Sequence, residues 1–215
     1  MPLEKMDDFF DVRADTYDDH MLVDLELDEF YEEIASRICP DKPNFRLLDL
    51  GCGTGLELSR LFDKYPDMQV TGVDLSPKML EQLRMKFPDK TFQLICGSYF
   101  DTDFSNGYDV VLSTYSLHHF SAEEKGMLYR KIYAALNFGG VFLLGDYTAL
   151  TKERQDEMIA ENIRIRQEQG LPDGEFYHVD IPFTAENEIR LMKDAGFQSV
   201  EVVRRWDNTS VILAR

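Results

Sequence analysis

The stretch "RLLDLGCGTGLELSRLF", residues 46–62, constrains the fold of this chain more than any other part of its sequence. An apolar run ends in a turn that holds three glycines, and apolar side chains then recur at every third or fourth position. The first pattern predicts a buried strand, and the second predicts a helix that packs one face against it. A strand, a tight turn and a helix in this order begin a β–α–β unit, so we expect a parallel sheet.

The same alternation continues along the chain. Near-continuous apolar runs, typical of strands whose two faces are both covered by helices, lie at 45–50, 69–74, 91–96, 108–113 and 140–146. Helix start signals stand between them: Ser76 precedes Pro77 as an N-cap and first-turn pair, and "SAEE" from Ser121 forms a capping box. We therefore predict an α/β fold with a Rossmann-like, doubly wound sheet and helices on both faces.

The C-terminus departs from this rhythm. After an expected helix over 184–195, two strand-like runs, "FQSVEVVRRW" and "TSVILA", are separated only by "DN". A connection this short predicts an antiparallel hairpin. The sheet is therefore expected to have seven strands, mostly parallel, with an antiparallel C-terminal hairpin.

The length of 215 residues suits a single domain, 1–215. Residues 1–44 read as an acidic, helical lid, and 45–150 read as the cofactor-binding core. Residues 151–183 form an insertion that begins as a charged helix and is expected to cap the substrate site at the carboxyl ends of the strands, where open α/β sheets bind ligands. Residues 184–215 supply the last helix and the hairpin.

Composition excludes several kinds of partner. The net charge is −17, with 40 acidic against 23 basic residues, whereas nucleic-acid-binding surfaces are normally basic. No apolar run approaches the roughly 18 residues of a membrane span, and the acidic N-terminus is unlike a secretory signal. We expect a cytoplasmic protein that binds neither nucleic acid nor membrane.

The sequence also predicts no bound metal. Cys39, Cys52 and Cys96 lack a CxxC pair, which argues against disulfides and structural zinc, and we expect them to be free, buried thiols. A metal site in such a fold would need a cluster of carboxylates at the strand ends. Asp146 is one such acid, but the sequence shows no companion for it.

The glycine turn narrows the choice of cofactor. Its glycines are Gly51, Gly53 and Gly55. This GxGxG spacing differs from the dinucleotide-binding GxGxxG, because Leu56 stands where the last glycine would be. Asp49, two residues before the turn, would repel a phosphate and favour an ammonium group. Asp74, at the end of the second expected strand, is placed to accept hydrogen bonds from both hydroxyls of a ribose.

At this point the sequence resembles the class I S-adenosylmethionine-dependent methyltransferases. "LLDLGCGTG" and "GVDLSPKML" match the first two motifs of that family, and "LICGSYFD", "YDVVLSTYSLHHF", "LNFGGVFLLGD" and "DAGF" follow in the family's order. The leading "FFDVRADTYDDH" looks like the helix that covers the cofactor in small-molecule members. The resemblance implies S-adenosylmethionine as cofactor, S-adenosylhomocysteine as product, a small-molecule methyl acceptor, and a monomer or homodimer.

The resemblance also assigns cofactor contacts. Residues implied around the methionine part are Asp49, Gly51, Cys52, Gly53, Gly55, Ser113 and Thr114. Residues implied around the ribose and adenine are Asp74, Leu75, Met79, Gly97, Ser98 and Tyr99. From the N-terminal segment, Tyr17 and Arg13 are expected to close over the cofactor.

Methyl transfer from a sulfonium is an in-line displacement that needs alignment and exclusion of water, and alignment supplies roughly 7–11 kcal/mol. A general base adds about 10²–10⁴-fold when the nucleophile arrives protonated. Candidate bases near the strand ends or in the insertion are His118, His119, His178, Tyr115 and Tyr177.

Three other readings stay open. Leu56 and the terminal hairpin argue against a nicotinamide-dependent oxidoreductase. A binding protein without transferase activity, or one that uses a modified, carboxylated cofactor, would be favoured by an arginine at the transferable group, for which Arg13 and Arg164 are the candidates. A protein methyltransferase would need an open acidic groove.

Overall fold

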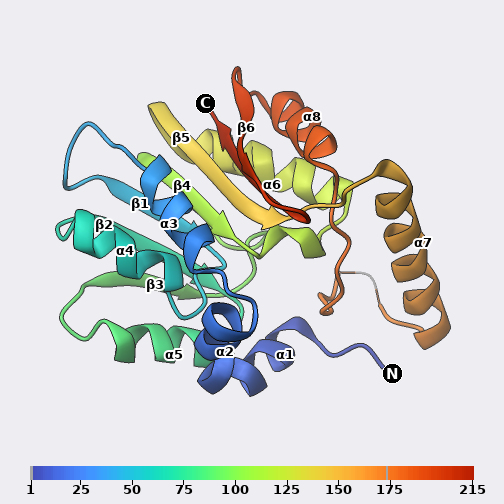
Figure 1. Ribbon diagram of the computed structural model, residues 1–215. Helices are drawn as coiled ribbons and strands as arrows, with labels where there is room; N and C mark the ends of the chain where they lie inside the picture. Colours follow the sequence, from blue (N-terminus) through green and yellow to red (C-terminus); the bar gives the residue numbers. More distant parts are fainter. Residues whose placement is uncertain (1, 173) are drawn as a thin grey trace.

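The computed structural model describes residues 2–172 and 174–215 (Figure 1). One seven-stranded sheet has the strand order β3-β2-β1-β4-β5-β7-β6. The strands are β1 Arg46–Leu50, β2 Gln69–Asp74, β3 Phe92–Cys96, β4 Tyr108–Thr114, β5 Leu136–Tyr147, β6 Val200–Arg205 and β7 Thr209–Ala214. The first five are parallel, and β7 is antiparallel to both β5 and β6. The predicted fold class and the terminal hairpin are confirmed.

Helices cover both faces of the sheet, with α3, α4 and α5 on one face and α6 and α8 on the other (Figure 1). The α-helices are α1 Met6–Arg13, α2 Tyr17–Asp19, α3 Asp28–Arg37, α4 Leu56–Lys64, α5 Pro77–Lys86, α6 Ala122–Ala135, α7 Lys152–Gln169 and α8 Ala185–Ala195. Shorter turns are η1 Ala14–Thr16, the π-helical η2 His20–Asp24 and η3 Leu117–His119. No helix in the described part of the chain is long and apolar enough to cross a membrane.

The two-sided core explains why the strands are apolar almost throughout. Successive residues of a strand point to opposite faces of the sheet. Leu48 of β1 and Val111 of β4 pack in the core beside α6 and α8, whereas Leu47 and Leu112 pack in the core beside α3 and α4. The central strands β1 and β4 therefore need apolar side chains at odd and even positions alike.

The predicted helix starts agree with the structure, whereas the predicted start of β5 does not. The Ser76 hydroxyl accepts a hydrogen bond from the Met79 amide at 3.0 Å, and both bonds of the Ser121–Glu124 capping box are present. The strand expected from residue 140 already begins at Leu136, directly after α6. Its early start follows from pairing of Leu136 with Tyr108, beside a register irregularity in β4.

The prediction of three buried thiols is wrong for two of them. Cys52 is buried, but Cys39 and Cys96 are exposed. Cys96 is the last residue of β3, which lies at the edge of the sheet, and Cys39 follows the end of α3.

A buried ion pair joins the two helices on one face of the sheet. The Lys125 ammonium of α6 contacts the Glu188 carboxylate of α8, and the Tyr129 hydroxyl donates to that carboxylate at 2.5 Å. The side chains of Lys125 and Glu188 are almost completely inaccessible to solvent. Removing one partner of such a pair leaves an uncompensated buried charge, which is far more costly than the loss of an exposed pair.

We expect Lys125→Met to lower the free energy of unfolding by about 3–5 kcal/mol, because Glu188 loses its cation. The matched control is Lys152→Met, which removes an exposed partner of Asp156 and should cost below about 1 kcal/mol. Urea unfolding monitored by circular dichroism measures both. Equal effects of the two substitutions would contradict the assignment.

Candidate active site

A narrow pocket opens where the carboxyl ends of β1, β2 and β4 meet. Residues lining it are Met6, Phe10, Tyr17, Gly51, Gly53, Asp74, Leu75, Met79, Tyr99, Thr114, Tyr115, Ser116 and His119. They come from the strand ends, the start of α5 and the N-terminal helices. We call it the first pocket.

Backbone amides hold the carboxylate at the end of β2. Asp74 accepts hydrogen bonds from the Gly53 amide at 2.9 Å and from the Ser76 amide at 2.8 Å. Burial raises the pKa of Asp74 to about 6, and these amide bonds oppose the rise. Gly51 has a φ of +76°, and a Cβ there would lie 2.3 Å from the Ser116 hydroxyl oxygen, so the turn admits no side chain at this position.

Two buried carboxylates stand beside the glycine turn. Among the described residues, neither oxygen of Asp49 nor Oε1 of Glu57 has a hydrogen-bond partner. Burial raises the pKa of both groups, and the neighbouring Glu57 charge raises the pKa of Asp49 further. Such a pair is stabilised when a cation neutralises it. Glu57 was not predicted as a site residue, although a charged residue on the buried face of α4 was a visible signal.

The acidic N-terminal segment is fastened over the first pocket by its carboxylates. Asp11 accepts from the Ser76 hydroxyl at 2.5 Å and from the Lys78 amide at 3.2 Å, so it caps the start of α5 from outside that helix. Asp18 accepts from the Thr54 hydroxyl at 2.5 Å. Acidic residues of this segment therefore hold it against the glycine turn and the start of α5.

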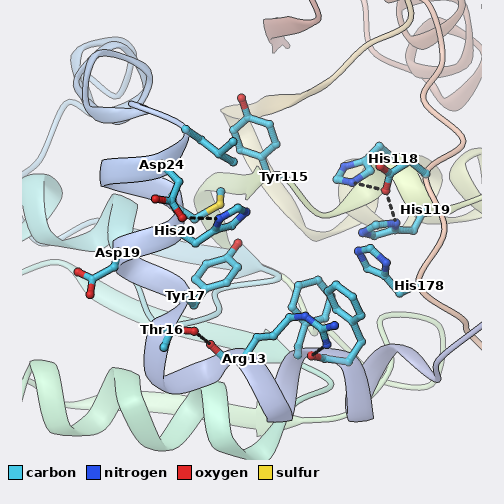
Figure 2. A pocket seen from close by; sticks show the side chains of 15 residues that line it. Arg13, Thr16, Tyr17, Asp19, His20, Asp24, Tyr115, His118, His119 and His178 are labelled. Atoms are coloured by element: carbon cyan, nitrogen blue, oxygen red, sulfur yellow. Dashed lines mark hydrogen bonds and ion pairs between the residues drawn. The ribbon is translucent and has the colours of Figure 1, made fainter.

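A second pocket, of about 630 Å³, lies beside the first. This volume is within the range of about 300–1,000 Å³ usual for small-molecule sites. Figure 2 shows His118, His119 and His178 along one wall, opposite the side chains of the N-terminal helices. Four residues line both pockets, namely Phe10, Tyr17, Tyr115 and His119. A ligand in the second pocket would therefore abut a ligand in the first.

The adjacent histidines differ in charge. His118 Nδ1 lies 2.6 Å from Asp146 Oδ1, and its Nε2 lies 3.4 Å from Asp180 Oδ1. Burial lowers the pKa of His118, but the two carboxylates outweigh it and raise this pKa to about 9. His119 Nδ1 donates to the Val179 carbonyl at 2.9 Å, and burial and the His118 charge hold the pKa of His119 well below its usual value.

Tyr115 follows β4 in a strained backbone conformation, with a φ of +45°. Its hydroxyl lies 2.8 Å from the Thr209 hydroxyl, and burial raises its pKa to about 12. The phenol is therefore neutral near pH 7 and suits positioning better than proton abstraction. The His178 ring stacks on Phe9 with ring centroids 3.5 Å apart.

The structure separates the sequence-predicted cofactor residues into groups. Those that line the first pocket are Tyr17, Gly51, Gly53, Asp74, Leu75, Met79, Tyr99 and Thr114. Those in the adjoining turn and strand ends, outside the lining, are Asp49, Cys52, Gly55, Gly97, Ser98 and Ser113. The Ser98 hydroxyl accepts from the Phe100 amide, and the Ser113 hydroxyl donates to the Leu50 carbonyl.

The candidate catalytic residues are gathered in the second pocket, which is lined by Tyr115, His118, His119 and His178. Tyr177 is outside the lining and donates to Glu175. Arg13 lines the second pocket rather than the first, and it donates to the Phe9 carbonyl. Arg164 is exposed on α7, paired with two glutamates.

The part of the insertion that reaches the site is the loop that follows α7. Within the described residues, His178 and Asp180 line the second pocket, but no residue of α7 lines either pocket. In Figure 1, α7 stands at the right-hand edge of the molecule, set apart from the sheet. Asp180 is the carboxylate companion of Asp146 that the sequence did not reveal.

Known proteins resemble this chain in sequence and in fold. Residues 47–140 match the family described as "Methyltransferase domain". The carboxy-S-adenosyl-L-methionine synthase of Helicobacter hepaticus is 29% identical over 180 residues, covering 78% of this chain and 74% of that protein.

Two solved structures share the fold. The "putative O-methyltransferase" of Nostoc punctiforme has a TM-score of 0.73 and 22% identity, covering 100% of this chain, which spans only 62% of that chain's length. DhpI in complex with SAM and HEP has a TM-score of 0.73 and 17% identity, covering 97% of this chain and 94% of that one.

We expect Glu57→Gln to stabilise the ligand-free protein at mildly alkaline pH by about 0.5–2 kcal/mol. The raised pKa means that the protonated carboxyl favours folding, so stability is lost as pH rises from the unfolded value, about 4.3, through the folded one. The neutral amide escapes this loss, and the difference should shrink towards acidic pH. Denaturant unfolding at several pH values tests this, with Glu81→Gln on the exposed face of α5 as control. A less stable Glu57→Gln variant at every pH would refute it.

Proposed function

We propose that the chain is a class I S-adenosylmethionine-dependent methyltransferase, which transfers a methyl group from S-adenosylmethionine to a small-molecule acceptor. The observation that carries the proposal is the junction of the two pockets. Phe10, Tyr17, Tyr115 and His119 line both, so an acceptor in the second pocket would meet the cofactor in the first.

The first pocket suits this cofactor electrostatically. No lysine or arginine is among the described residues that line it, whereas Asp74 faces it and the Asp49–Glu57 pair adjoins it. The cofactor carries a sulfonium and an ammonium, and the ammonium would neutralise Asp49 and Glu57. Asp74 would accept from the ribose hydroxyls, while Leu75 and Met79 offer apolar surface to the adenine.

When bound, S-adenosylmethionine supplies an electrophilic methyl group. The protein's part is to align the acceptor and to exclude water, which is the larger contribution to such a displacement. Tyr115 is fixed by its bond to Thr209, and Phe10 adds an apolar wall from the lid. His119 lines both pockets, and its ring is neutral near pH 7, so it adds polar surface without charge where the acceptor would meet the cofactor.

A second candidate function comes from the name of the Helicobacter relative, carboxy-S-adenosyl-L-methionine synthase. A carboxylated cofactor would need a cation to bind its added carboxylate. Arg13 is the arginine that lines the second pocket. Its guanidinium is, however, engaged by the Phe9 carbonyl and by Glu4, which weakens this alternative.

Cofactor binding tests the first step. We expect Asp74→Asn to weaken S-adenosylmethionine roughly tenfold or more, because a hydrogen bond to a charged group is worth about 1.5–3 kcal/mol. In the unaltered protein the affinity should rise as pH rises through about 6, where Asp74 ionises, and the variant should lack this step. Calorimetry measures both, with the exposed Asp63→Asn as control. Absence of binding by the unaltered protein would refute the function.

Product analysis separates the two candidate reactions. The protein is incubated with S-adenosylmethionine that carries a deuterated methyl group, in an extract of small metabolites. We expect S-adenosylhomocysteine together with an acceptor that has gained the whole deuterated methyl group. A product heavier than the cofactor by the mass of CO₂, with part of the deuterium lost, would instead establish the synthase reaction. Mass spectrometry distinguishes these outcomes.

A further inference from the structure

We propose that His118, His119 and Asp180 bind a divalent transition-metal ion of the zinc class in the wall of the second pocket. One ligand atom of each residue lies within 4.8 Å of the others, without any rearrangement. Two imidazoles and one carboxylate form the ligand set of catalytic zinc and related ions. The existence of the site is argued from these residues alone, whereas its role rests on the proposed function.

Two of the three separations between ligand atoms are close to those that a metal requires, and the third is within 4.8 Å. His118 Nε2 lies 3.4 Å from Asp180 Oδ1, and His119 Nδ1 lies 3.5 Å from the same oxygen. Tetrahedral ligands at about 2.0–2.2 Å from an ion are themselves roughly 3.3–3.6 Å apart. The rings of His118 and His119 are in contact, with centroids 4.0 Å apart.

The surrounding hydrogen bonds orient His118 as a ligand. His118 Nδ1 donates to Asp146 at 2.6 Å, and Asp146 is itself held by the amides of Leu117 and Tyr147. A carboxylate behind the ring is the arrangement that orients metal-binding histidines. The ion would take the place of the proton on His118 Nε2, which faces Asp180, and of the proton that His119 Nδ1 shares with the Val179 carbonyl.

The burial of the ligands indicates a catalytic rather than a structural site. His118 and His119 are buried, whereas the Asp180 side chain is 40% exposed, towards the second pocket. Three protein ligands leave a coordination position open for a ligand from that pocket. An acceptor thiol or hydroxyl bound there would lose its proton near neutral pH, because an ion of this class lowers the pKa of such a group.

This assigns the substrate class: a small molecule whose thiol or hydroxyl is the methyl acceptor. The metal-bound S–H or O–H bond breaks and its proton passes to solvent through the pocket. The resulting sulfur or oxygen pair forms the new bond to the methyl carbon. The carbon–sulfonium bond breaks, and its electron pair stays on sulfur as the thioether of S-adenosylhomocysteine.

The test is a titration of the full-length, chelator-treated protein with Co²⁺, followed by competition with Zn²⁺. We expect one ion per chain, with visible absorption bands of low-coordinate cobalt that zinc abolishes. Asp180→Asn and His118→Ala should weaken binding at least tenfold, and Asp146→Asn roughly 10–100-fold, the usual cost of losing the group behind a metal-bound histidine.

Control variants keep the proposal falsifiable. His20→Ala and Asp24→Asn alter a histidine–carboxylate pair on the opposite wall and should leave cobalt binding unchanged. Thermal unfolding and S-adenosylmethionine binding show whether each variant is folded. No cobalt spectrum, or a spectrum lost only in the His20 and Asp24 variants, would overturn the proposal. The cobalt titration and the zinc competition need neither cofactor nor acceptor. Failure of the metal proposal can therefore be told apart from failure of methyl transfer.

Discussion

The candidate site depends on the hydrogen bonds that the Asp74 carboxylate accepts. It accepts one hydrogen bond from the Gly53 amide of the glycine turn and one from the Ser76 amide at the start of α5. It therefore joins two strand–helix connections. Ser76 in turn donates its hydroxyl to Asp11 of the lid. One buried acid thus joins the end of β2, the turn after β1 and the segment that covers the pocket.

The buried carboxylates beside the two pockets differ in whether they have a partner. Beside the first pocket, both oxygens of Asp49 and Oε1 of Glu57 are buried without a hydrogen-bond partner among the described residues. Beside the second pocket, His118 is already paired with Asp146 and with Asp180. Burying polar groups without partners is costly, and a cationic ligand in the first pocket would offset that cost.

Segments far apart in sequence close the second pocket. The Met6 amide donates to the Phe176 carbonyl and the His178 amide donates to the Glu4 carbonyl, so the lid and the loop after α7 run together as a short antiparallel pair. This pairing brings Phe9 against His178. The enclosure comes from this loop, while the charged helix before it stays at the periphery.

Sequence patterns alone determined the architecture and the first pocket: the apolar strands, the Ser76 cap, the glycine turn with Asp74, and the terminal hairpin. These are short-range signals, because periodicity, caps and turns depend on neighbouring residues. Only tertiary structure decided that Glu57 faces Asp49, that Asp180 joins His118 and His119, and that Arg13 lines the second pocket. Those contacts join positions distant in the chain, and no local pattern encodes which buried charges meet when helices and loops pack onto the sheet.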